Sequence, residues 1–498
     1  MSHSFERDEY RMIVANEAVA AAAGEWMTTF APATNEALAE VPRGGAADVD
    51  SAVAAARAAF DGGKWRRTGA QRRNKLLMGL ADHLWGHLDD LARMEARDNG
   101  KAVSSVKGEM IQAISELEFF AGAATKIRGH TVPTPHGFLN YTVREALGVC
   151  ALIVPWNYPF LLAIRKVAPA LAAGNAVVLK PASATPLSAI ILGELAAEAG
   201  FPPGTLNVVT GPGSSTGQAL VAHPGVDKVS FTGSTANGRG VLGAAAGDFR
   251  RVTLELGGKS PNLVFDDADL DAAVPGSVWS IFYSAGESCE ARSRLYVQRG
   301  ILDSFQARFV AATEGLVVGD PMDPATQIGA LISPEHLAGV EEFIAAAVAE
   351  GATVLAGGAR PQDPALAQGN YLLPTVLTGV NHDARVCREE IFGPVVTIVP
   401  FDTEEEAVAM ANDTVYGLAA SVWTADARRA IRVAGALRSG IVTVNQPFTV
   451  FPGTPFGGVK QSGWGKEASL EALDDYTELK SVVAYAGTRP VDPFGVGG

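Results

Sequence analysis

Apolar residues follow two spacing patterns along the chain, and the change of pattern divides the chain into two regions. From residue 46 to residue 127 they return every three or four positions, which predicts helices over 46–60, 71–97 and 105–120. From Gly148 onward, short apolar runs alternate with helical segments such as 186–199 and 216–222. Strands and helices in alternation are typical of a parallel, doubly wound sheet.

The strand-like runs form two series, which predicts two sheets. The first series is 149–154, 176–179, 206–209, 228–231 and 251–256. The second begins after Cys289 and comprises 294–297, 351–355, 395–400, 419–423 and 441–444. The series part near Gly257–Gly258, where we expect a domain boundary. The fold class is therefore α/β, with two doubly wound, Rossmann-type domains.

Composition limits the classes of partner. The chain has 498 residues, of which 47% are hydrophobic, so it can bury a large core. Its net charge of −14 argues against binding to nucleic acid or to an anionic membrane surface. Three widely spaced cysteines make no disulfide framework, and the first ten residues lack an apolar signal core. We expect a cytoplasmic protein without nucleic-acid or membrane partners.

One stretch, Leu147–Ile164, is long and apolar enough to suggest a membrane span. Pro155 and Pro159 lie inside it with Asn157 between them, and a polar amide between two helix breakers would be costly in lipid. We interpret the stretch as a buried strand, a sharp turn and the start of a helix.

Cys289 is a candidate nucleophile, because a thiolate attacks carbonyl carbons well. The glycine three residues before it, Gly286, would let a ligand approach closely. A small buried cysteine is the simpler interpretation of this local pattern, and both stay open here. The eight histidines include no metal-ligand cluster, so we predict no metal site.

Polar residues follow the predicted strands of the first series, where such sheets bind ligands. Asn157 can donate to a developing oxyanion, or it can be an ordinary turn residue. Lys180 and Ser183 can bind a nucleotide ribose, although a surface lysine is equally compatible with the pattern. Gly233 and Ser234 open a helix and can face a pyrophosphate.

Two glutamates complete the set of candidate groups. Glu255 ends a strand before two glycines, so it is either a general base with a pKa raised by burial or an acid solvated or paired with Lys259. Glu390 precedes a glycine turn, and Phe392 can pack on a flat ring.

Taken together, these residues resemble the aldehyde dehydrogenase superfamily in order and spacing. Glu255 lies 34 residues before Cys289 and Glu390 lies 101 residues after it, both typical of that family. Asn445 and the run 455–467 are similar to the family's last motif. The resemblance covers about residues 25 to 485.

The resemblance implies a role for each residue. Cys289 would form a thiohemiacetal with the aldehyde, and the Asn157 amide with the Cys289 backbone N–H would form the oxyanion hole. Glu255 would activate the water that hydrolyses the thioester, assisted by Lys166 and Glu467 in proton relay. The implied ligands of NAD or NADP are Pro155, Trp156, Lys180, Ser183, Gly213, Gly233, Ser234, Leu256, Glu390 and Phe392.

The resemblance also implies an aldehyde dehydrogenase-like architecture. The cofactor domain would comprise residues 1–127 and 148–256, and the catalytic domain residues 257–470. Residues 128–147 and 471–498 would form a β-arm and tail that assemble homodimers or homotetramers.

Two departures from the family pattern stand out. The usual glutamine two residues before the nucleophile is Glu287 here, and Glu290 follows Cys289 directly. Carboxylates there should raise the thiol pKa, unless they point away into ion pairs or Arg292 or Arg294 compensates. Ser183 stands where NAD-dependent relatives often have glutamate, which leaves NADP acceptable.

Substrate class depends on five residues that the resemblance places at the substrate tunnel: Tyr158, Arg165, Phe448, Phe451 and Phe456. Arg165 lies seven residues after Tyr158, so both side chains can face one tunnel. Arg165 would bind a substrate carboxylate, or it pairs with a nearby acid outside the tunnel. We rank neutral aliphatic or aromatic aldehydes first, acid-bearing semialdehydes second and betaine-like aldehydes last.

Rival functions remain. A CoA-acylating enzyme is disfavoured because that branch generally lacks the base at Glu255. A catalytically silent structural member is disfavoured because Asn157, Glu255, Cys289 and Glu390 are all present. Ester hydrolysis is a side activity that the same site could show.

Overall fold

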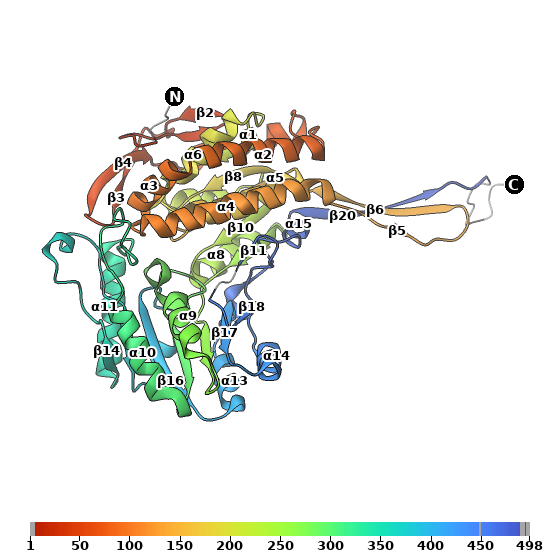
Figure 1. Cartoon of the computed structure of the whole chain (residues 1–498). Helices are drawn as coiled ribbons and strands as arrows, with labels where there is room; N and C mark the ends of the chain where they lie inside the picture. Colours follow the sequence, from red (N-terminus) through yellow and green to blue (C-terminus); the bar gives the residue numbers. More distant parts are fainter. Residues whose placement is uncertain (1–4, 448–449, 489–493, 495–498) are drawn as a thin grey trace.

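Two large sheets and a projecting β-arm organise the chain (Figure 1). The computed structural model describes residues 5–447, 450–488 and 494. No helix among these described residues is long and apolar enough to cross a membrane. The stretch that suggested a span is a buried strand, β7 (Val149–Ile153), followed by helix α5 (Pro159–Ala173) with proline at its first position.

The first sheet has eight strands in the order β19-β11-β10-β7-β8-β9-β1-β2. Its five central strands are parallel, and strands β7, β8 and β10 are buried along their whole length, as expected where helices cover both faces. The bounds are β1 Met12–Val14, β2 Glu17–Val19, β8 Ala176–Lys180, β9 Leu206–Val208, β10 Lys228–Thr232, β11 Arg251–Glu255 and β19 Gly463–Trp464.

The second sheet has seven strands in the order β14-β15-β16-β13-β12-β17-β18, all parallel except the edge strand β14. The bounds are β12 Pro261–Val264, β13 Arg294–Gln298, β14 Thr353–Ala356, β15 Thr375–Thr378, β16 Val395–Phe401, β17 Ala419–Trp423 and β18 Ile441–Val444. The series therefore begins at β12, before Cys289, and not after it. Proline at its first position and only four residues hid β12 from the hydrophobic pattern.

Helices surround the sheets. The predicted helix over 71–97 is two helices that meet at His87, because the backbone there leaves the helical region. The bounds of the helices are α1 Ala46–Asp61, α2 Ala70–Gly86, α3 Leu88–Asn99, α4 Val103–Ala123, α6 Leu187–Glu198, α7 Gln218–Ala222, α8 Thr235–Ala246, α9 Leu270–Phe282, α10 Leu302–Glu314, α11 Pro334–Ala349, α12 Arg385–Arg388, α13 Glu404–Asn412, α14 Ala427–Ala436 and α15 Ala472–Asp475.

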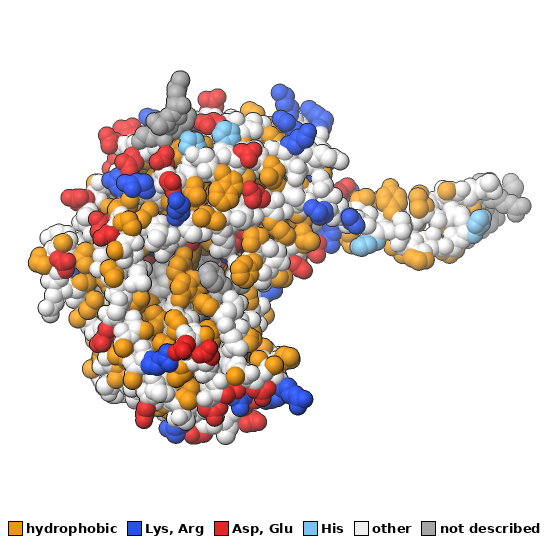
Figure 2. Space-filling view, viewed as in Figure 1, with side chains coloured by type: hydrophobic (Ala, Val, Ile, Leu, Met, Phe, Trp, Pro, Cys, Tyr) orange, Lys and Arg blue, Asp and Glu red, His pale blue; other side chains and the backbone are white. Residues whose placement is uncertain are grey.

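The arm is a three-stranded antiparallel sheet that projects from the body. Strand β6 (Phe138–Ala146) pairs along its length with β20 (Thr477–Tyr485), and β5 (Thr131–Val132) lies at the edge. Hydrophobic side chains line its exposed surface (Figure 2). They include Val132, Phe138, Leu139, Leu479, Val483 and Tyr485. A separate hairpin joins β3 (Trp26–Ala31) to β4 (Glu36–Pro42).

Candidate active site

Cys289 lies on a loop whose backbone is unusual. After α9, Ser284, Ala285 and Gly286 are all left-handed, with φ of 54°, 53° and 71°. A Cβ atom on Gly286 would lie 2.2 Å from the carbonyl oxygen of Gly393. This glycine is therefore required for close packing against a neighbouring backbone, and not for the approach of a ligand as its position suggested.

The Cys289 side chain lies where two cavities meet. One cavity, of about 360 Å³, is also lined by Glu255, Glu467, Tyr158 and Arg165. The other, of about 240 Å³, is lined by Cys289 together with Pro155, Trp156, Asn157, Thr232, Gly233, Ser234, Leu256, Gly257, Glu390 and Phe392. Residues far apart in the sequence thus converge on one sulfur atom from both sides.

The side chain of Asn157 is held by the loop that carries Cys289. Its Nδ2 donates to the backbone carbonyl of Glu287 at 2.9 Å, and the amide is 3% exposed. Only one of the two N–H groups is used by this bond, so the other remains available to an oxygen bound beside Cys289.

Glu255 ends β11 opposite Thr232 of β10, and both of its carboxylate oxygens are buried with no hydrogen-bond partner among the described residues. Burial and the nearby Glu467 raise its pKa well above the usual range, and Lys166 opposes this rise. Lys166 Nζ donates to Glu467 and, at 3.0 Å, to Ser230 Oγ. A buried acid with a raised pKa beside a lysine–glutamate pair can accept and pass on a proton.

The environment of Cys289 disfavours the thiolate. Burial, then Glu290, Glu255 and Glu390, raises the pKa of the thiol well above its usual value, and Arg165 opposes them. Glu290 lines the larger cavity and also lies 3.2 Å from Arg292, so the expected ion pair is present. These neighbours therefore favour the neutral thiol form of Cys289.

Glu287 behaves differently from Glu290. Its side chain is fully buried, and Oε1 accepts a hydrogen bond from the backbone N–H of Ile332 at 3.0 Å. Arg294, one of the two arginines considered as compensation, instead donates to backbone carbonyls, including that of Lys259 at 2.8 Å. We expected both carboxylates to point away into ion pairs. Glu290 forms an ion pair with Arg292 but still lines the cavity beside Cys289, whereas Glu287 lines neither of the two cavities.

Arg165 lines the cavity but its guanidinium is already engaged. Nε and Nη2 donate to both carboxylate oxygens of Glu116 at 3.0 and 2.7 Å, and the two side chains are 4% and 0% exposed. The guanidinium also lies 5.2 Å from the centre of the Phe456 ring. Arg165 thus forms the ion pair of the second alternative, but it does so without leaving the cavity wall.

Of the remaining residues expected near the substrate, some line the larger of the two cavities that meet at Cys289 and others do not. Tyr158 and Phe456 line the larger cavity, together with Leu161, Leu162 and Trp279. Phe451 is 57% exposed and is not part of this lining, and Phe448 lies outside the described residues.

A third cavity, of about 680 Å³, lies between β10, α7 and α8 and includes Gly213. Lys180 and Ser183 are not in its lining. Lys180 Nζ donates to the carbonyl of Pro181, and burial lowers its pKa to about 8. Ser183 Oγ donates to the carbonyl of Gly211 at 2.9 Å. Both side chains are therefore bonded to backbone groups at the ends of neighbouring strands.

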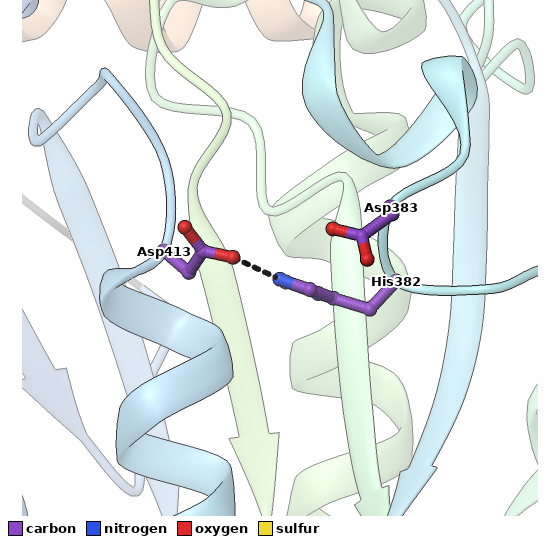
Figure 3. Close-up of side chains that lie close together, drawn as sticks. All are labelled: His382, Asp383 and Asp413. Carbon is purple, nitrogen blue, oxygen red and sulfur yellow. Dashed lines mark hydrogen bonds and ion pairs between the residues drawn. The ribbon is translucent and has the colours of Figure 1, made fainter.

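One group of potential metal ligands was found among the described residues: His382, Asp383 and Asp413 (Figure 3). His382 Nε2 bonds to Asp413 at 3.1 Å, and the Arg388 guanidinium pairs with both aspartates. Since an arginine already balances these carboxylates, the group is accounted for as an ion-pair network. That the protein needs no metal stays a prediction.

Comparison with known proteins identifies the family. Residues 19–482 match the model of the aldehyde dehydrogenase family. The chain belongs to this family. It is 41% identical over 476 residues to a betaine aldehyde dehydrogenase of Bacillus subtilis strain 168, covering 94% of this chain and 97% of that protein. An aldehyde dehydrogenase of Emericella nidulans is 44% identical over 472 residues, covering 95% and 94%.

The fold agrees with solved structures of the family. The NAD+ complex of an aldehyde dehydrogenase from Bacillus cereus superposes with a TM-score of 0.95 at 41% identity, covering 97% of this chain and 98% of that one. The predicted family, fold class and enzyme class are confirmed.

Several site residues were missed from the sequence. Thr232 lines both cavities, Trp279 lines the larger one, and Glu116 binds Arg165. Thr232 could have been found, since it ends a strand just before the Gly233–Ser234 loop. Trp279 and Glu116 sit within helices α9 and α4, where nothing in the local pattern separates them from ordinary helix residues.

Proposed function

We propose that this chain oxidises an aldehyde to a carboxylic acid with NAD+ or NADP+ through a covalent intermediate on Cys289. The observation that carries the proposal is the position of the sulfur between two cavities, with Asn157 on one and Glu255 on the other. Such an arrangement lets the same carbon be attacked by sulfur, lose hydride toward one cavity and meet water in the other.

In the first step, the Cys289 thiol gives its proton to water in the cavity as its sulfur forms a bond to the aldehyde carbon, so that the carbonyl oxygen becomes an oxyanion. The free N–H of Asn157 and the backbone N–H of Cys289 would stabilise that charge. A nicotinamide dinucleotide held in the smaller cavity would supply the acceptor for the hydride that leaves this carbon. Loss of that hydride would leave a thioester on Cys289.

In the second step, the oxygen of a water molecule attacks the thioester carbon while Glu255 takes a proton from that water. The carbon–sulfur bond then breaks and the acid leaves. Proximity supports Lys166 and Glu467 as the groups that return the proton of Glu255 to solvent, because they form the charged neighbourhood of that carboxyl group.

The cofactor residues fit a dinucleotide. A side chain on Gly257 would place Cβ 2.2 Å from Glu390 Oε2, and one on Gly233 would meet the Phe231 ring at 2.6 Å, so neither position has room for a side chain. Glu390 would bind the nicotinamide ribose, while Gly233, Ser234 and Gly213 would face the phosphates and the adenosine. Ser183 lacks a charge that would repel a 2′-phosphate, so NADP stays as acceptable as NAD.

The substrate is proposed to be a neutral aliphatic or aromatic aldehyde. Tyr158, Leu161, Trp279 and Phe456 give the larger cavity a mainly apolar wall. Two N–H groups of Arg165 are engaged by Glu116, which weakens the case for a semialdehyde whose carboxylate would need them.

We further propose that the first sheet carries the cofactor domain, the second sheet the catalytic domain, and the arm a contact between copies in a homodimer or homotetramer. The apolar side chains exposed on the three arm strands support this, because a second copy could bury them.

The test is to measure absorbance of reduced nicotinamide with a panel of neutral and acid-bearing aldehydes and both cofactors. Oxidation of neutral aldehydes that is lost in Cys289→Ala supports the proposal. Activity that requires CoA, or none with any aldehyde, would contradict it.

A further inference from the structure

His336 occupies the first turn of α11 and contacts the site from outside both cavities. Its backbone N–H is capped by Ser333 Oγ at 3.2 Å, which fixes the start of the helix. Its Nε2 lies 2.7 Å from the backbone carbonyl of Phe392. Since a carbonyl can only accept, Nε2 carries the proton of this hydrogen bond.

The residue that His336 holds is unusual. Phe392 has a left-handed backbone with φ of 60°, which costs energy for a side chain of this size. Its ring lines the smaller cavity together with that of Trp156. The histidine ring packs edge-on against Trp156, with centroids 5.4 Å apart, and Trp156 packs edge-on against Phe392 at 5.3 Å. One hydrogen bond and two ring contacts therefore set both aromatic walls of this cavity.

The same histidine reaches the nucleophile loop. Glu287 Oε1 lies 3.5 Å from His336 Nε2 and accepts from the Ile332 N–H just before α11. The backbone carbonyl of Glu287 holds Asn157, and Cys289 follows two residues later. Glu287 thus joins the start of α11 to the nucleophile loop and to the oxyanion residue.

Burial favours the neutral forms of the His336 imidazole and the Glu287 carboxyl group. Burial lowers the pKa of His336, and burial raises the pKa of Glu287 well above its usual range. The 3.5 Å approach of Glu287 Oε1 to His336 Nε2 is therefore a packing contact, and the effect of His336 is geometric more than electrostatic.

We propose that His336 is a positioning residue that fixes Phe392 and Trp156, the aromatic walls of the cavity assigned to the nicotinamide, relative to the Cys289 loop through Glu287. The inference rests on the proposed function. Hydride transfer requires the nicotinamide ring to be aligned with the covalent intermediate on Cys289. Attack of Cys289 on an ester requires no nicotinamide.

The experiment compares two activities of the same cysteine in His336→Phe, which keeps an aromatic ring but removes the donor to Phe392. We expect the pre-steady-state burst of reduced nicotinamide to slow by about tenfold and NAD+ to bind more weakly, as for a lost buried hydrogen bond. Hydrolysis of p-nitrophenyl acetate without cofactor should stay within about twofold of wild type. His336→Gln, whose amide can donate to the same carbonyl, should recover most of the burst.

The matched control is His382→Phe, at a histidine that lies in neither cavity lining, which should leave both activities as in wild type. The proposal is overturned if His336→Phe lowers ester hydrolysis and the burst equally, if it changes neither, or if His336→Gln is no better than His336→Phe. Should the phenylalanine variant not fold, the comparison of His336→Gln with the shorter His336→Asn decides in the same way. Absence of aldehyde oxidation in the wild type would instead refute the proposed function.

Discussion

The two cavities that meet at Cys289 were built by different parts of the sequence. Most of the lining of the smaller one comes from loops that directly follow strands, such as Trp156–Asn157, Gly233–Ser234 and Leu256–Gly257. The larger one takes much of its wall from helices α4, α5 and α9. In a sequence, glycines and polar residues after an apolar run mark the end of a strand. The residues on one face of a buried helix have no comparable mark. Most of the smaller cavity could therefore be predicted from the sequence, apart from Thr232 and Gly257, and the larger cavity only in part.

The largest effect should come from the thiol at which the two cavities meet. Cys289→Ala should reduce aldehyde oxidation and ester hydrolysis by about a thousandfold or more, because both begin with attack by its sulfur. Cys150→Ala and Cys387→Ala, at the two fully buried thiols, are the controls and should retain activity. Loss of activity in the Cys150 variant with an active Cys289 variant would show that the wrong thiol was chosen.

Glu255→Gln should separate the two halves of the reaction. The burst of reduced nicotinamide should persist, while the steady-state rate falls by about a hundredfold, because the amide cannot take a proton from water. Since the pKa of Glu255 is raised, only its deprotonated fraction acts as base, so wild-type deacylation should rise with pH and the variant should lose that rise. A missing burst with normal NAD+ binding would place Glu255 earlier in the reaction.

Arg165→Leu tests the helical wall of the larger cavity. It leaves Glu116 buried without its partner, so thermal or urea unfolding should show a loss of about 3–5 kcal/mol. Activity on an acid-bearing and a neutral aldehyde of equal length should fall by the same factor. The double change Arg165→Leu with Glu116→Leu should recover much of the stability. A loss confined to the acid-bearing aldehyde would restore the semialdehyde alternative.

The smallest effect is expected on the cofactor side. Ser183→Glu should weaken NADP relative to NAD by about tenfold, because a carboxylate would repel the 2′-phosphate in a partly solvated site. Steady-state efficiencies with both cofactors measure the ratio, and Ser183→Gln controls for size. An unchanged ratio would mean that Ser183 takes no part in the choice.

Much of the fold was accessible before the structure. Continuous apolar runs such as 176–180 are typical of strands covered on both faces, and they lie where they were expected. Strand β12, with proline at its start, and the break between α2 and α3 at His87 were not. Short elements are specified by the neighbours with which they pair, so their own residues carry a weak signal.

By itself, the sequence determined the family, the alternation of strands and helices, and the spacing of Asn157, Glu255, Cys289 and Glu390. These features depend on short stretches of consecutive residues, whose apolar pattern, glycines and polar groups can be identified in the sequence. Only the tertiary structure decided that Arg165 pairs with Glu116, that Gly286 packs against Gly393, and that Glu287 lies beside His336. Each of these contacts joins residues 49 or more positions apart. Which partner a buried charge or polar group finds depends on how whole elements pack, and that information is spread over the entire chain.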